Sequence, residues 1–140
     1  MSLIPAHVDV QCLNYFANLS KHGGVNARPV HMFMLAMKNP SDDSFKKALD
    51  ACHECTFIHL EAMAYERYAS FLSAQSKERA NECLTSAYWL YRDWGAHLKA
   101  LRLSEEHTFL KVRGFCDPRS LTIFASNLIL VVFEIGRAHV

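Results

Sequence analysis

The feature that most constrains the fold is a pair of neighbouring helical patterns joined by only three residues. From about residue 56 to 74, apolar side chains recur three and four positions apart, which predicts a helix with one apolar face. The same spacing recurs from about residue 78 to 94. Because the connection at residues 75–77 is short, the second helix must return antiparallel beside the first. The sequence therefore predicts a central helical hairpin, within a helical region from about residue 41 to 103.

Further helices are predicted on both sides of this hairpin, at about residues 7–21, 29–38, 41–54 and 96–103, the last of them reaching residue 110 in the longest interpretation. Gly23 and Pro40 separate the first three of these helices. Glycine tolerates the backbone conformation that ends a helix, and proline disfavours a helical residue before it. Strand patterns are nearly absent before the last twenty residues. The predicted fold class is all-α, with about six helices and an irregular C-terminal tail.

Alanines that face large apolar residues indicate helices packed closely in a repeat. Ala80, Leu84 and Ala87 fit the second helix of a tetratricopeptide repeat, whereas the tryptophan and glycine of its first helix are missing. The predicted architecture is a degenerate tetratricopeptide-like α-solenoid of antiparallel hairpins, whose units bury their faces by stacking. The residues expected in its core are Leu13, Phe16, Phe45, Leu49, Leu60, Ala64, Phe71, Ala80, Leu84, Ala87, Tyr91 and Trp94.

Composition narrows the class of partner. Hydrophobic residues make up 51% and the formal net charge is +1, so no strong field attracts nucleic acid or an anionic membrane. The apolar run at residues 121–133 is shorter than the ~20 residues that a bilayer requires. The five cysteines follow no secretory signal, which favours free thiols in a cytoplasmic protein. We expect neither nucleic acid nor a membrane as partner.

A set of residues with a recognisable pattern runs through the hairpin and the turn after it. Its members are Phe57, His59, Glu61, Glu66, Phe71, Ala80, Leu84, Ala87, Tyr91, Trp94, Gly95, Ala96 and Lys99, with Asn26, His31, Leu35 and Ala36 upstream. Together, over residues 13–103, they resemble the helical-repeat region of large multidomain sensor kinases that also carry a protein-kinase-like domain, an ATPase domain, a GAF domain and a histidine kinase module. Met37, Lys38 and Ala100 depart from that family, which has acidic residues and often a valine at these places. The resemblance implies a connector whose catalytic domains lie outside this chain.

Residues with chemistry of their own form no convincing site. Cys52, Cys55 and His59 are the best zinc candidates, since thiolates at C-x-x-C spacing bind zinc, but a second ligand pair is missing and burial as small apolar residues is favoured. No cysteine–histidine pair has a visible activating context, and no phosphate-binding loop is present. The aromatic cluster of Tyr88, Trp89, Tyr91 and Trp94 is expected to be helix packing rather than a base-stacking surface. We predict no catalytic residue, no cofactor and no metal.

The chain divides into three parts by pattern. Residues 1–113 are expected to be a helical-repeat segment of a longer solenoid, and residues 114–134 a tail of doubtful origin without helical periodicity. Residues 135–140, Ile-Gly-Arg-Ala-His-Val, resemble the translation of a common sequencing adapter. Residues 104–108 resemble another frame of the same adapter, but an acidic helix fits there and we keep them in the repeat segment.

The expected function is that of a non-catalytic scaffold or linker in a multidomain signalling ATPase or kinase, which packs against neighbouring helical repeats of the same or another protein. The alternative is a free-standing module that binds peptides. A repeat segment without its neighbours exposes apolar end faces, so we expect the isolated chain to self-associate.

The origin of the last six residues has a direct test. If they derive from an adapter, amplification and sequencing of the genomic locus will show no reading frame that encodes residues 135–140 in register with the helical segment. An uninterrupted frame through all six residues would show that they are native.

Overall fold

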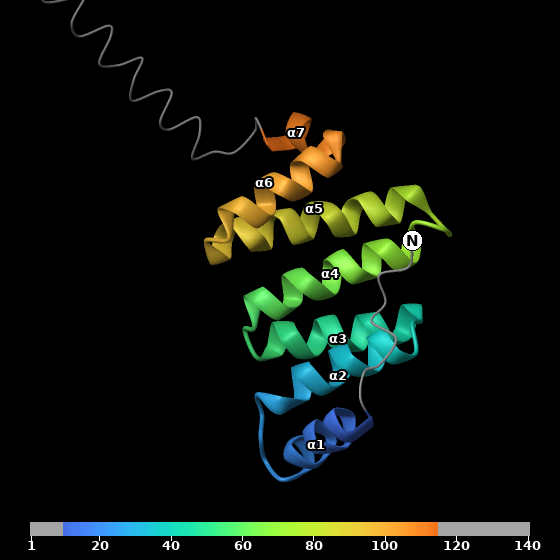
Figure 1. The fold of residues 1–140 in the computed structure, drawn as a ribbon, viewed down its shortest axis with the longest axis vertical. Coiled ribbons are helices and arrows are strands. Elements are labelled where there is room, and N and C mark those ends of the chain that lie inside the picture. Colours follow the sequence, from blue (N-terminus) through green and yellow to red (C-terminus); the bar gives the residue numbers. More distant parts are fainter. Residues whose placement is uncertain (1–9, 115–140) are drawn as a thin grey trace, which may run out of the picture. The chain divides into compact units, whose positions relative to one another are not determined.

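The computed structural model describes residues 10–114, and these residues are all-helical, as the periodicity predicted (Figure 1). The helices are α1 (Val10–Lys21), α2 (Ala27–Lys38), α3 (Asp42–Glu54), α4 (Ile58–Leu72), α5 (Lys77–Trp94), α6 (His97–Glu106) and α7 (Thr108–Gly114). The chain divides into two compact units between Arg102 and Leu103, inside α6. In the first unit, α1 to α5 lie side by side in chain order. The predicted tail at residues 114–134 falls almost entirely outside the described residues, and residues 135–140 lie outside them.

Local sequence explains where the helices begin. Ser41 caps α3: its hydroxyl accepts a hydrogen bond from the Ser44 amide at 3.1 Å, and the Ser44 hydroxyl accepts one from the Ser41 amide at 3.0 Å. This capping box satisfies two amides that a helix start leaves without partners. Ser76 caps α5 in the same way, by accepting from the Arg79 amide at 3.4 Å. The helix expected from residue 29 starts at Ala27, so that Pro29 lies in its first turn, where a missing N–H is tolerated.

An interruption near His107 adds a helix that the sequence did not predict. The segment expected at 96–103, or as far as 110, forms α6 and then α7 as separate helices. The His107 amide still donates to the Leu103 carbonyl at 3.0 Å, and the Leu110 amide donates to His107 at 3.0 Å in a tighter turn. The apolar period gives no sign of this break, because it needs only one residue outside the helical conformation.

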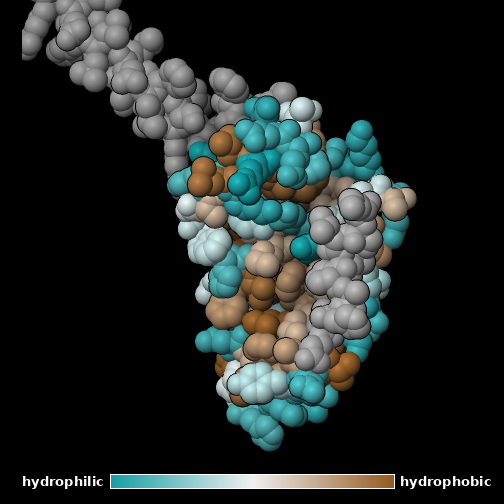
Figure 2. All heavy atoms as spheres, in the orientation of Figure 1, coloured by the Kyte–Doolittle hydropathy of each residue, from teal (hydrophilic) through white to brown (hydrophobic). Residues whose placement is uncertain are grey.

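An aromatic cluster joins α3 to α4. The ring of Phe45 stacks on Tyr68 with centroids 5.2 Å apart and lies 5.8 Å from the ring of Phe71. On the other side of α4, alanines allow α5 to approach closely, and this is the most extensive helix pair in the described structure. Ala62 and Ala87 are completely buried, and Ala69 and Ala80 nearly so. On the face shown in Figure 2, apolar side chains gather over α2, α3 and α4.

Most of the predicted core residues are buried, and one prediction is wrong. Leu13, Phe45, Leu49, Leu60, Ala64, Ala80, Leu84, Ala87 and Tyr91 are buried, whereas Phe16 and Phe71 are half-buried. Trp94 is 55% exposed. It is the last residue of α5, and its ring stacks on His59 without being enclosed. Tyr88 and Trp89, also expected to pack between helices, are half-buried.

Truncation of Phe45 tests the aromatic cluster. Phe45→Ala removes a ring that is 2% exposed and in contact with two others, so the free energy of unfolding should fall by about 3–5 kcal/mol. Urea denaturation, followed by the circular dichroism signal of the helices at about 222 nm, measures this loss. Met63→Ala is the control, because Met63 is 43% exposed and its loss should cost only about 0.5 kcal/mol. Equal losses in both variants would contradict the assignment of this core.

Candidate functional site

Three residues from the sequence pattern meet at one carboxylate. Glu66 on α4 accepts a hydrogen bond from the Tyr91 hydroxyl of α5 at 2.8 Å through Oε2, and from Lys99 Nζ of α6 at 2.8 Å through Oε1. The Lys99 ammonium also lies 5.6 Å from the centroid of the Tyr91 ring, within the range of a cation–π contact. The Glu66 cluster, formed by these three side chains, ties three successive helices together.

The aromatic members of the pattern form a row beside the turn. The rings of Phe57 and His59 are 5.4 Å apart, and His59 is 5.4 Å from Trp94. Gly95 then ends α5 with φ of 92°, a value that favours glycine. The Ala96 amide donates to the Tyr91 carbonyl at 2.8 Å and the Gly95 amide donates to the Arg92 carbonyl at 3.0 Å, which together make a Schellman motif.

The remaining members of the pattern lie at packing positions. Ala80, Leu84 and Ala87 are buried on α5, and Phe71 contacts Phe45 from α4. Glu61 is a buried carboxylate, only 9% exposed, and its Oε1 lies 3.4 Å from Nδ1 of His53. None of these residues joins the Glu66 cluster. The pattern therefore corresponds to helix contacts distributed over α4, α5 and the start of α6.

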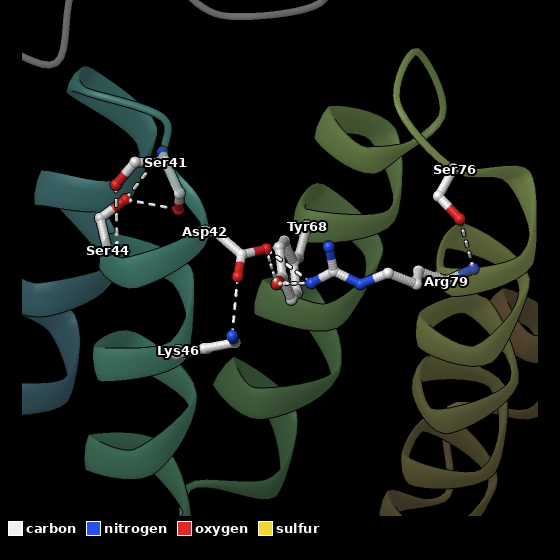
Figure 3. Close-up of polar contacts among 7 residues, drawn as sticks. All are labelled: Ser41, Asp42, Ser44, Lys46, Tyr68, Ser76 and Arg79. Atoms are coloured by element: carbon white, nitrogen blue, oxygen red, sulfur yellow. Dashed lines mark hydrogen bonds and ion pairs between the residues drawn. The ribbon is translucent and has the colours of Figure 1, made fainter.

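A second polar cluster was not predicted from the sequence. Asp42 at the start of α3 accepts from the Tyr68 hydroxyl of α4, from Arg79 Nη2 of α5 at 2.6 Å and from Lys46 Nζ at 2.7 Å (Figure 3). Arg79 Nη2 also donates to the Tyr68 hydroxyl oxygen at 2.8 Å. Tyr68 and Arg79 lie 26 and 37 positions from Asp42, and no spacing rule in the sequence connects residues so far apart.

The contacts of the Asp42 cluster shift the pKa values of its members. Lys46 first, then Tyr68 and Arg79, hold the pKa of Asp42 well below its usual range. Burial, together with the hydrogen bond to Asp42, raises the pKa of Tyr68 to about 12. Burial, followed by the hydrogen bond that the Tyr91 hydroxyl donates to Glu66, also raises the pKa of Tyr91. Both tyrosines are thus held in their neutral, donating form, which suits a bridge between helices and not a general base.

The cysteine candidates do not come together as a metal site. Cys52 is completely buried, and burial, followed by the nearby Glu61 and Cys55, raises its pKa to about 12, away from the thiolate that binds zinc. The Cys55 thiol donates to the Val25 carbonyl at 3.7 Å, while His59 lies in the aromatic row. Among residues 10–111, no three histidine, cysteine or acidic side chains gather in a way that could hold a metal ion. Cys116 lies outside the described residues.

Comparison of the chain with protein-family models, with curated proteins and with solved structures finds no match. The resemblance to the repeats of sensor kinases therefore stays a prediction. Within the part of the chain that the structure describes, no helix combines the length and the apolar character needed to span a bilayer.

The pH dependence of stability tests the Asp42 cluster. Because the folded-state pKa of Asp42 is lowered, its contribution is present above the ordinary aspartate pKa of about 4 and is lost as the pH falls below it. We expect Asp42→Asn to be less stable than the parent chain at pH 7, and the difference to narrow at about pH 2.5. Urea midpoints at the two pH values measure it.

The neighbouring Asp43→Asn is the control for this test. Asp43 also lies in the first turn of α3, but its side chain is 77% exposed and forms an ion pair with Lys47 on the same helix. A loss at pH 7 as large as that of Asp42→Asn would mean that the helix start, and not the bridge to α4 and α5, is responsible.

Proposed function

We propose that the chain is a non-catalytic helical scaffold segment of a cytoplasmic, multidomain signalling ATPase or kinase, and that it packs against neighbouring helical repeats. The Glu66 cluster is the observation that supports this most. Glu66, Tyr91 and Lys99 all belong to the residue pattern that resembles the sensor-kinase repeats, and they contact one another from three helices. A pattern whose members connect helices fits a connector better than it fits a reaction centre.

The chemical state of the candidate reactive groups also supports a scaffold. Burial raises the pKa values of the Cys52 and Cys83 thiols, so neither is poised as a nucleophile. The Tyr68 and Tyr91 hydroxyls are committed to carboxylates. An active site would instead need reactive groups that converge on a space for substrate.

The outer face of the first described helix offers a place for a neighbouring repeat. Leu13 of α1 is buried toward the stack, whereas Tyr15 and Leu19, one helical turn apart, are 61% and 38% exposed. Apolar side chains on the outside of a terminal helix are what a solenoid covers with its next unit. A stand-alone repeat protein normally carries a polar capping face at this position.

Self-association of the purified chain tests this proposal. If α1 presents a stacking face, light scattering coupled to size-exclusion chromatography should give a mass above that of one chain at about 100 µM, where weak interfaces are populated. Tyr15→Lys combined with Leu19→Lys should shift the mass toward the monomer, because charges on the face oppose its burial.

Met63→Lys is the control, since Met63 is 43% exposed on α4, away from α1. It should leave the mass unchanged. A parent chain that is monomeric and unfolds cooperatively would argue against a segment of a longer solenoid and for the peptide-binding module.

A further inference from the structure

The first part of α6 buries little apolar surface. Within residues 97–102, Ala100 is the buried residue, at 2% exposure, while Leu98 is 78% exposed. An alanine side chain buries little apolar area, so its contribution to attachment is small. The contrast with α3 and α4, which are joined by stacked aromatic rings, is clear.

Lys99 attaches this segment to α4 through an ion pair with Glu66. The side chain of Lys99 is 44% exposed and that of Glu66 is 26% exposed, so the pair is partly screened by water. The Tyr91 hydroxyl donates a hydrogen bond to the other oxygen of Glu66, and the Tyr91 ring makes a cation–π contact with the Lys99 ammonium. The hydrogen bond between Tyr91 and Glu66 joins α4 to α5 through a different oxygen from the one that Lys99 contacts.

The turn between α5 and α6 allows such a departure. The Schellman hydrogen bonds from Gly95 and Ala96 satisfy carbonyls at the end of α5 without any contribution from α6. A Cβ built on Gly95 would meet no heavy atom within 4 Å, so no side chain packs against the pivot. Detachment of α6 therefore leaves the end of α5 intact.

From these contacts we infer that Gly95 and the Glu66–Lys99 pair form a hinged latch, through which residues 97–102 detach from α4 and α5 while both of those helices stay folded. The latch closes when Lys99 binds the Glu66–Tyr91 pair. Its opening exposes Ala100 and separates Lys99 from Glu66, whereas opening α3 from α4 would expose stacked aromatic rings.

Hydrogen–deuterium exchange measured by mass spectrometry tests the latch. Lys99→Met keeps the length of the side chain but removes its charge, and should speed exchange in peptides covering residues 97–102 by about twofold to fivefold. Exchange in the interiors of α4 and α5 should stay at the parental rate. Lys99→Arg retains the charge and should restore parental exchange in α6.

Lys47→Met is the matched control. It breaks a lysine–carboxylate pair of similar length, 2.7 Å to Asp43, but on α3, and should not change exchange in residues 97–102. The latch is refuted if Lys99→Met leaves exchange in α6 unchanged, or if exchange in α4 and α5 rises by the same factor, which would report general destabilisation. Both outcomes are separate from the self-association test, since they concern opening at Gly95 and not the face of α1.

Discussion

The close approach of α4 to α5 is the constraint on which the other contacts depend. Buried alanines on both helices set this distance, and large side chains at those positions would push the helices apart. Tyr91 reaches Glu66, and Arg79 reaches Tyr68, only because α5 lies this near to α4. The two polar clusters therefore form because the apolar interface is tight, and their hydrogen bonds also help to join α4 to α5.

The Asp42 and Glu66 clusters share one design, displaced by one helix. In each cluster, a carboxylate on one helix accepts a hydrogen bond from a tyrosine hydroxyl on the next helix. It accepts a second hydrogen bond from an arginine or lysine on the helix after that. A repeat of two helices would place equivalent contacts two helices apart. These two clusters lie one helix apart, so the same set of contacts is displaced by a single helix and not by a two-helix hairpin.

Periodicity was sufficient for the helices and most of the core, because a helix that buries one face must repeat its apolar residues. Periodicity was insufficient where the burial or the contacts of a side chain depend on the position of one helix relative to another. Trp94 lies on the predicted apolar face but at the end of α5, where its ring is not enclosed. Asp42 and Arg79 are 37 positions apart, and their contact depends on the register of α3 against α5. The family-like pattern identified Glu66, Tyr91 and Lys99 as a set without indicating that they touch.

The helices of the first unit differ in the kind of contact that holds them, and this sets where the stack opens. Phe45, Tyr68 and Phe71 give α3 and α4 an aromatic interface, which water weakens little. Lys99, in residues 97–102, contacts α4 through a partly exposed ion pair with Glu66, which water and salt weaken directly. Local stability should therefore fall from α4 toward Gly95. In a connector, such a gradient confines movement to one turn and leaves the packed helices as a rigid support.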